Sequence, residues 1–132
     1  MFKNFFPNKI LSFSNKLLSF LIVLMLLIVF VGLIYALFLS PPDFTQGDSV
    51  RIMYVHVPAS FIALGCFAFI GIASVCALIF KIKILPLMAK SLAPVGSVFA
   101  LVSIVTGSLW GKPTWGTWWV WDARLTSMLI LF

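Results

Sequence analysis

The tryptophans of this chain gather in one short segment. All five fall within the string WGKPTWGTWWVWDARLTS, at Trp110, Trp115, Trp118, Trp119 and Trp121. An aromatic belt at a membrane interface would be shared between both faces of a protein, whereas these side chains are concentrated in one place. Indole rings offer rigid, flat apolar area at little cost in rotamer entropy. The cluster therefore favours a binding site for a large planar molecule. If the chain is helical from Trp115 onward, Trp115, Trp118 and Trp119 share one face and Trp121 neighbours Trp118.

Two charged residues follow the last tryptophan. Arg124 carries a permanent cation whose planar fork pairs with carboxylates, and Asp122 is suited either to orient that fork or to cap a following helix. The alternative is that the two residues form a local ion pair that anchors the segment at the membrane interface. Both interpretations remain open from the residue types alone.

The chain has a single histidine, His56, which lies close to Tyr54. An imidazole at such a position is commonly a hydrated interfacial group. Heme, however, is a planar macrocycle with carboxylates and an iron atom, and it requires a flat apolar wall, cations and a nitrogen donor. The tryptophan segment, Arg124 and His56 offer one of each. Another hydrophobic ligand or a protein partner would also suit the same residues.

The composition of the whole chain is typical of a membrane protein. Of the 132 residues, 63% are hydrophobic and 9% are charged, compared with about 45–50% and about 25% in ordinary soluble domains. This composition excludes a water-soluble globule and a disordered tail. Two cysteines are too few for a disulfide scaffold. The sequence also lacks CxxC motifs, clusters of metal ligands and glycine-rich phosphate loops.

Charge-free stretches predict the membrane spans. We expect an all-α integral membrane protein, a multi-pass helical bundle in which residues 1–132 form one transmembrane domain, with three complete spans and the start of a fourth. The spans are about 17–39, 54–80 and 91–110, and a fourth run over 124–132 is incomplete. Pro41 and Pro42 should end the first span, and Pro58 should lie in the first turn of the second. Gly111 and Pro113 should break the third, leaving a tryptophan-rich outer loop over 110–124.

The distribution of lysine and arginine predicts the orientation. Six lysines lie before the first span and between the second and third, at Lys3, Lys9, Lys16, Lys81, Lys83 and Lys90. The opposite side has three bases and all three acids, at Arg51, Lys112, Arg124, Asp43, Asp48 and Asp122. The positive-inside rule therefore predicts a cytoplasmic amino terminus and places the tryptophan loop outside. Basic residues are not interleaved with aromatic ones in a patch, so nucleic-acid binding is not expected.

The third span has a face of small residues, which lets membrane helices approach closely. Its members recur at helical spacing, at Ala93, Gly96, Ser97, Ala100, Ser103 and Gly107. Cys66 and Cys76 lie about 15 Å apart along one helix, too far for a disulfide. We interpret them as small apolar side chains.

Two strings, VRIMYVHVP over 50–58 and WGKPTWGTWWVWDARLTS over 110–127, resemble those of the heme exporter protein C family, a membrane component of cytochrome c maturation. The resemblance covers roughly residues 41–132. It implies a six-span protein of the bacterial inner membrane, or of its mitochondrial equivalent. That protein holds heme b as cargo at the extracytoplasmic face and passes it to a periplasmic heme chaperone, working with ABC transporter subunits.

The resemblance also implies roles for particular residues. The heme platform corresponds to Trp110, Trp115, Trp118, Trp119, Trp121 and Asp122, and one axial ligand of the heme iron corresponds to His56. The family's second axial histidine lies in a later outer loop, which this chain does not reach, so we expect the sequence to be a fragment or a truncated product. Met53 or Met128 would be a soft substitute ligand, but spacing favours neither.

Three functions remain open at this point. The first is a heme-binding membrane chaperone with no covalent chemistry of its own, hence not an enzyme. The second is a component of a cytochrome c synthase, or heme lyase, which would need further histidines and an outer site for a CxxCH substrate. The third is a structural subunit whose tryptophans dock a partner such as the transporter.

Overall fold

The structure is a computed structural model that describes residues 8–132, with side chains from Ser12 onward. It divides into two compact units, one ending at Leu39 and one running from Ser40 to Phe132. The described residues form helices and loops, without a strand. Three of these helices are long and apolar enough to cross a membrane, over Ser12–Leu39, Val50–Phe80 and Ile84–Trp115. The expected multi-pass helical membrane protein is thus confirmed.

The first unit is a single helix. Helix α1 spans Asn8–Ile34 and continues as a π-helical turn over Tyr35–Leu39. Its apolar side chains are exposed around the whole circumference, so this helix has no distinct polar face to turn toward water. The helix ends immediately before Ser40 and Pro41, as the two prolines predict.

Helix α2 spans Val50–Phe80 and begins earlier than expected. Pro58 was predicted in its first turn but lies well inside the helix. A proline there removes one donor from the helical ladder, yet a membrane helix tolerates it when its neighbours hold the backbone in place. Near the start of α2, the Arg51 guanidinium donates to the carbonyl of Ser40 from Nε and Nη2, at 3.2 and 2.9 Å.

Helix α3 spans Ile84–Trp115, so the predicted break at Gly111 and Pro113 is wrong. Pro113 interrupts only one hydrogen bond of the ladder, and the Thr114 hydroxyl donates to the carbonyl of Trp110 at 3.0 Å in the same turn. The helix ends at Gly116, whose φ of 76° is left-handed and whose N–H donates to the carbonyl of Lys112. Such a glycine cap is a common helix end.

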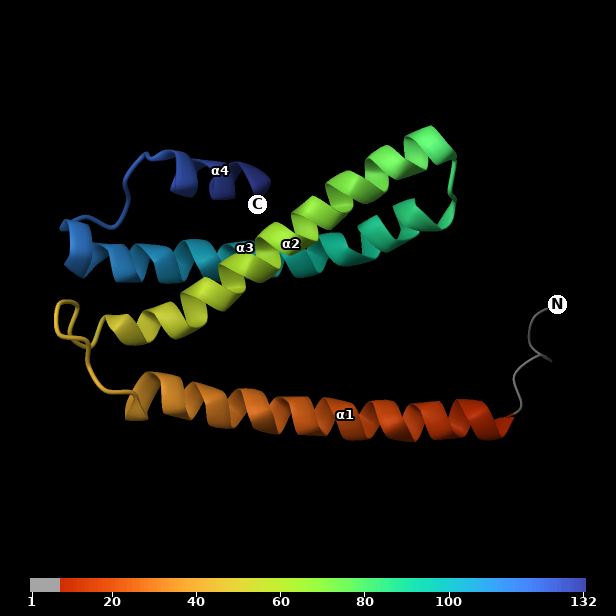
Figure 1. Cartoon of the computed structure of the whole chain (residues 1–132), viewed down its shortest axis with the longest axis horizontal. Coiled ribbons are helices and arrows are strands. Elements are labelled where there is room, and N and C mark those ends of the chain that lie inside the picture. Colours follow the sequence, from red (N-terminus) through yellow and green to blue (C-terminus); the bar gives the residue numbers. More distant parts are fainter. Residues whose placement is uncertain (1–7) are drawn as a thin grey trace. The chain divides into compact units, whose positions relative to one another are not determined.

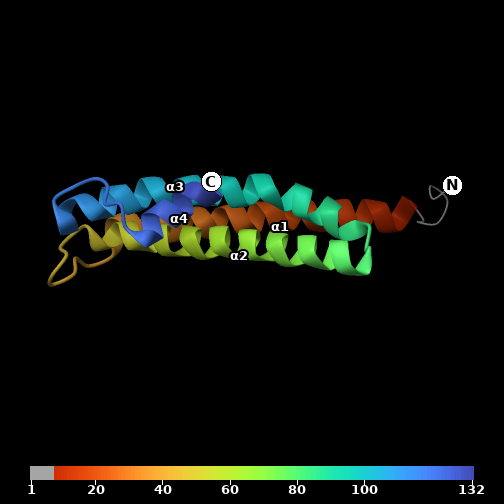
Figure 2. The same ribbon diagram turned by 90° about the horizontal axis from the view of Figure 1, so that it is seen from above.

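Helices α2 and α3 cross and pack against each other (Figures 1 and 2). Small residues form much of the buried contact. The buried residues of α2 are Ala59, Ala63, Cys66 and Ala73, and those of α3 are Ala89, Gly96, Ala100, Ser103, Gly107 and Gly111. A Cβ on Gly96 would lie 3.0 Å from the Cβ of Cys66. Of the predicted small face of the third span, Gly96, Ala100, Ser103 and Gly107 are buried, whereas Ala93 and Ser97 are half-buried. Both cysteines are free thiols.

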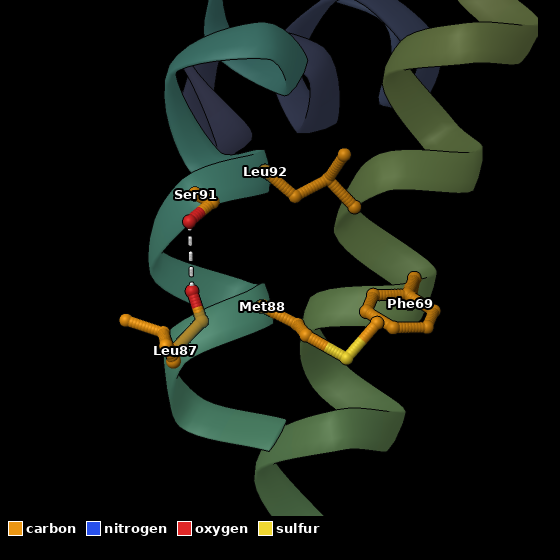
Figure 3. A pocket seen from close by; sticks show the side chains of 5 residues that line it. All are labelled: Phe69, Leu87, Met88, Ser91 and Leu92. Atoms are coloured by element: carbon orange, nitrogen blue, oxygen red, sulfur yellow. Dashed lines mark hydrogen bonds between the residues drawn. The ribbon is translucent and has the colours of Figure 1, made fainter. Parts of the chain in front are cut away.

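The surface between α2 and α3 toward the Lys81–Lys83 turn carries an open apolar groove of about 480 Å³. Its lining residues are Phe69, Leu87, Met88, Ser91 and Leu92, and Met88 points toward the Phe69 ring (Figure 3). The Ser91 hydroxyl donates to the carbonyl of Leu87 at 2.9 Å. The one polar side chain of the groove is therefore satisfied within its own helix, as suits a hydrocarbon environment.

Helix α4 spans Ala123–Leu131 and folds back beside α3 (Figure 1). Asp122 has extended backbone and accepts the N–H of Leu125 at 2.8 Å, so it is the N-cap of this helix. The helix starts where the fourth apolar run was expected. Residues 116–122 connect α3 to α4 without helical structure.

Candidate functional site

A polar cluster lies at the buried seam of α2 and α3. One turn of α2 presents His56 and Ser60, and the facing turns of α3 present Ser103 and Thr106. The Ser60 and Ser103 hydroxyls are 2.6 Å apart, and Ser103 is buried. Polar side chains between membrane helices are commonly functional, because hydrocarbon offers them no other partners. This seam is therefore a candidate functional site.

His56 is held at this seam through one ring nitrogen. Its Nδ1 lies 3.0 Å from the carbonyl oxygen of Ser103 and 3.1 Å from the hydroxyl of Thr106. Its Nε2 has no hydrogen-bond partner within residues 8–132. Sequence reasoning singled out His56 but missed Thr106, because a threonine in an apolar helix carries no signal of its own.

A series of rings links His56 to the tryptophan segment. The centroids of the His56 and Trp110 rings are 6.0 Å apart, and those of Trp110 and Trp115 are 6.4 Å apart. The guanidinium of Arg124 lies over the Trp115 ring, 5.5 Å from its centroid. Both distances between rings fall in the range of favourable aromatic contacts. The structure thus brings four of the predicted site residues into one contiguous row.

Gly111 makes this arrangement possible. A Cβ at this position would lie 2.9 Å from both Cε3 and Cζ3 of Trp115, closer than real Cβ contacts. The glycine lets the Trp115 indole fold back against its own helix and reach Trp110. It was predicted to break the helix; the structure assigns it to the packing of an indole instead.

The other three indoles lie differently from the prediction. Residues 116–122 are not helical, so Trp115, Trp118 and Trp119 do not share a helical face. Trp119 and Trp121 form an edge-to-face pair at 5.5 Å, while the ammonium of Lys112 lies 5.6 Å from the centroid of Trp118. The prediction of one flat wall is therefore wrong, because the left-handed Gly116 ends the helix before the later tryptophans.

Trp110 and Trp119 differ in the state of their indole N–H groups. Trp110 donates to the side-chain oxygen of Gln46 at 2.9 Å, which ties the loop after α1 to the end of α3. The Nε1 of Trp119 is buried and has no acceptor among the described residues. A buried donor without an acceptor is costly, so this atom is suited to an acceptor from outside the described chain. Gln46 was not predicted as a site residue, and its spacing gives no hint of the contact.

Asp122 and Arg124 are paired with each other. The guanidinium Nε and Nη2 both donate to Oδ2 of Asp122, at 3.0 and 2.7 Å. The N–H of Leu125 and then the Arg124 side chain lower the pKa of Asp122 below its usual value. The cap and the ion pair considered as alternatives for Asp122 therefore exist together.

A pocket of about 330 Å³ lies between α2, α3 and α4. Its polar lining groups are His56, Ser60, Ser103, Arg124 and Ser127, and its apolar walls include Leu64, Ile104, Leu125 and Met128. This volume is within the usual range for small-molecule sites. Met128 thus shares a pocket with His56, whereas Met53 does not line it.

These residues fit part of what heme requires. An imidazole nitrogen without a partner suits the iron, the apolar pocket walls suit a macrocycle, and Arg124 suits a carboxylate. The Trp110 and Trp115 indoles are not among the residues that line this pocket, but they adjoin His56 and Arg124. Residues 8–132 contain no group of three or more His, Cys, Asp or Glu side chains suited to a metal ion.

Comparison with known proteins agrees with the resemblance noted in the sequence. The family model for heme exporter protein C matches residues 1–132. The chain is 48% identical over 126 residues to heme exporter protein C of Haemophilus influenzae, covering 96% of this chain and 51% of that protein. Identity to the protein of the same name from Escherichia coli K12 is 41% over 125 residues, covering 95% and 51%.

A third relative is heme exporter protein C of Rhodobacter capsulatus, 40% identical over 126 residues, with 96% of this chain and 52% of that protein covered. The chain spans about half the length of these curated relatives. The range matched by the family model includes both strings that suggested the resemblance. This chain belongs to the heme exporter protein C family.

Proposed function

We propose that this chain is part of a membrane protein that binds heme b as cargo at the extracytoplasmic face and presents it to a periplasmic heme chaperone. In this proposal it acts with ABC transporter subunits and performs no covalent chemistry itself. The observation that carries the proposal is the placement of His56. Its Nε2 has no hydrogen-bond partner in the described chain, and its ring lines a pocket that Arg124 also lines.

The neighbouring residues support this role by their chemistry. Trp110 lies beside the imidazole at 6.0 Å and offers a flat apolar surface to a macrocycle near the iron. Arg124 has one carboxylate partner already, but its guanidinium has five donors and the structure uses two of them on Asp122. Donors remain for a heme propionate.

The membrane and the charge pattern support the orientation. The tryptophan segment and the loop over residues 40–49 meet through the Gln46–Trp110 hydrogen bond, so they lie at the same end of the second unit. The Lys81–Lys83 turn lies at the other end of α2. With the lysine-rich end in the cytoplasm, the site faces the periplasm of a bacterial inner membrane, or the equivalent side in mitochondria.

Exposure of two indoles supports a second candidate function. Trp118 and Trp121 are 55% and 76% exposed, and exposed indoles are typical anchors of protein interfaces. These two residues are suited to dock a partner, such as a transporter subunit, while His56 and Trp110 bind the cargo. The two functions require different residues and can be separated experimentally.

Heme titration of the purified chain in lipid nanodiscs tests the first function. We expect a Soret band of bound ferric heme in the wild-type chain and its loss or marked weakening in His56→Ala. Val57→Ala is the matched control, because Val57 is the next residue of the same helix and does not line the pocket. A wild-type chain without the band, or a band that His56→Ala leaves unchanged, would contradict the proposal.

A pull-down separates the second function from the first. Trp121→Ala should weaken capture of the transporter subunits while leaving the Soret band in place. His56→Ala should do the reverse. If both variants affect both measurements equally, the assignment of separate residues to cargo and partner is wrong.

A further inference from the structure

The imidazole of His56 lies unusually close to the backbone of α3. A Cβ built on Gly107 would lie 2.9 Å from Cε1 of His56, 3.4 Å from Nδ1 and 3.8 Å from Nε2. Real Cβ atoms essentially never approach other atoms within 3.0 Å. Only glycine at position 107 therefore allows the ring to occupy this place, one residue after Thr106 and one turn after Ser103.

The same place fixes the hydrogen bonds of the ring. The carbonyl oxygen of Ser103 can only accept, and it lies 3.0 Å from Nδ1. The Thr106 hydroxyl donates to the carbonyl of Val102 at 2.6 Å, so its oxygen faces Nδ1, 3.1 Å away, as an acceptor. Both oxygens are satisfied when Nδ1 carries the proton. A bare Nδ1 would instead place its lone pair against that of the Ser103 carbonyl.

We propose that α3 locks His56 in the Nδ1–H tautomer and that Gly107 is the positioning residue that admits the ring to the Ser103 carbonyl. Neutral imidazole has one protonated and one unprotonated nitrogen. The lock therefore leaves Nε2 with its lone pair available in the absence of any ligand. The tautomer is a property of the heme-free chain. Only its role, which is to present Nε2 to the heme iron, rests on the proposed function.

The lock has a consequence for binding. Partners that fix the second nitrogen of a metal-binding histidine orient the ring and set its tautomer, and their loss typically costs about 10–100-fold in metal affinity. Here the partners come from another helix, so the orientation of the ligand depends on the α2–α3 contact. Thr106 adds a second acceptor and should contribute less than the carbonyl that Gly107 makes accessible.

Nitrogen NMR of the heme-free chain tests the tautomer directly. The chain has one histidine, so labelling histidine with ¹⁵N reports His56 alone. In nanodiscs at a pH where the ring is neutral, we expect the proton on Nδ1 and an unprotonated Nε2. A ring with its proton mainly on Nε2, or an equal mixture of tautomers, would overturn the inference whether or not the chain binds heme.

Gly107→Ala tests the positioning role. The added methyl group should push the ring away from Ser103, give a mixture of tautomers and weaken ferric heme binding by about 10-fold. Gly65→Ala is the matched control, because it adds the same methyl group to α2 where nothing lies within 4 Å. A Gly107→Ala chain with wild-type tautomer and affinity would contradict the proposal.

A second pair of variants decides the matter if Gly107→Ala does not fold. Thr106→Val removes the hydroxyl with little change of shape, and Thr106→Ser keeps it. We expect Thr106→Val to reduce the fraction of the Nδ1–H tautomer. It should also lower heme affinity, but less than His56→Ala does. Thr106→Ser should behave as wild type. Identical spectra for Thr106→Val and Thr106→Ser would contradict the part of the lock assigned to the Thr106 hydroxyl, and a Thr106→Val ring with its proton mainly on Nε2 would contradict the part assigned to the Ser103 carbonyl. A chain that shows the tautomer but binds no heme would refute the proposed function and leave the lock intact.

Discussion

The side-chain oxygen of Gln46 accepts a hydrogen bond from the indole nitrogen of Trp110 at 2.9 Å, across 64 positions of sequence. Gln46 belongs to the loop that precedes α2, whereas Trp110 lies near the end of α3. Both side chains are half-buried. This bond therefore fixes the outer ends of two helices relative to each other and holds the indole that stands beside His56.

Loss of the acceptor at Gln46 should destabilise this end of the protein. Gln46→Met keeps the length of the side chain but leaves the half-buried indole N–H without its partner, which should cost about 1 kcal/mol of unfolding free energy. Phe44→Ala in the same loop is the control, because Phe44 is fully exposed at 103% and should change little. Denaturation with SDS in mixed micelles measures both. Equal stability of Gln46→Met and Phe44→Ala would argue against the bond.

A methyl group at Gly111 should displace Trp115. The Cβ would lie 2.9 Å from two atoms of the indole, and overpacking of this kind typically costs about 1–3 kcal/mol. Gly71→Ala provides the contrast, since nothing lies within 4 Å of its Cβ and alanine favours a helix interior by about 1 kcal/mol. Because Gly111 lies inside a helix as well, Gly111→Ala gains the same propensity but disturbs Trp115, so its unfolding free energy should be about 1–3 kcal/mol lower than that of Gly71→Ala. Equal unfolding free energies of the two variants would contradict the packing assigned to Gly111.

Acid should weaken the N-cap of α4. Hydrogen bonds from Leu125 and Arg124 lower the pKa of Asp122 in the folded state. The stabilisation from this carboxylate is complete above the unfolded pKa of about 3.9 and is lost as the pH falls further, through the lower folded pKa. Asp122→Asn, measured by thermal unfolding at pH 6 and pH 3, should show a smaller loss of stability on acidification than the wild type.

Asp43 provides a built-in comparison for that experiment. The Thr45 hydroxyl, followed by the N–H groups of Gln46 and Thr45, lowers its pKa as well. Asp43→Asn should therefore remove another part of the acid sensitivity, and the double variant should have the flattest pH profile. An Asp122→Asn chain with the full wild-type acid response would show that the Asp122 carboxylate contributes nothing to the acid sensitivity.

Cysteine labelling tests which end of the second unit faces outward. In a background with Cys66→Ala and Cys76→Ala, Asp48→Cys marks the loop that Gln46 joins to the tryptophan segment, and Lys83→Cys marks the opposite turn. A membrane-impermeant maleimide added to intact bacterial cells should label the first and spare the second. The reverse pattern would place the candidate site in the cytosol.

The sequence predicted what depends on composition and on local periodicity. Charge-free stretches located three helices, and the small residues Gly96, Ala100, Ser103 and Gly107 correctly marked the buried face of α3. Helix ends were less predictable. Pro58 and Pro113 look like boundaries in isolation, but each removes only one donor, and both helices continue through them.

The predicted site residues were found near one another only in part. His56, Trp110, Trp115 and Arg124 form one row of contacts, but Trp118, Trp119 and Trp121 follow the left-handed Gly116 and turn away from a shared helical face. Gln46, Thr106 and Gly107 act through contacts between segments far apart in sequence. Such contacts depend on how two helices pack, and residue types or spacing within one segment do not determine them.

Resonance Raman spectroscopy of the heme-loaded chain tests the central claim, that His56 binds the iron, most directly. With histidine labelled by ¹⁵N, the single imidazole of the chain is the only labelled side chain that could shift an iron–nitrogen vibration. We predict a band that moves to lower frequency on labelling and disappears in His56→Ala. Bound heme whose spectrum is insensitive to the label would contradict the account.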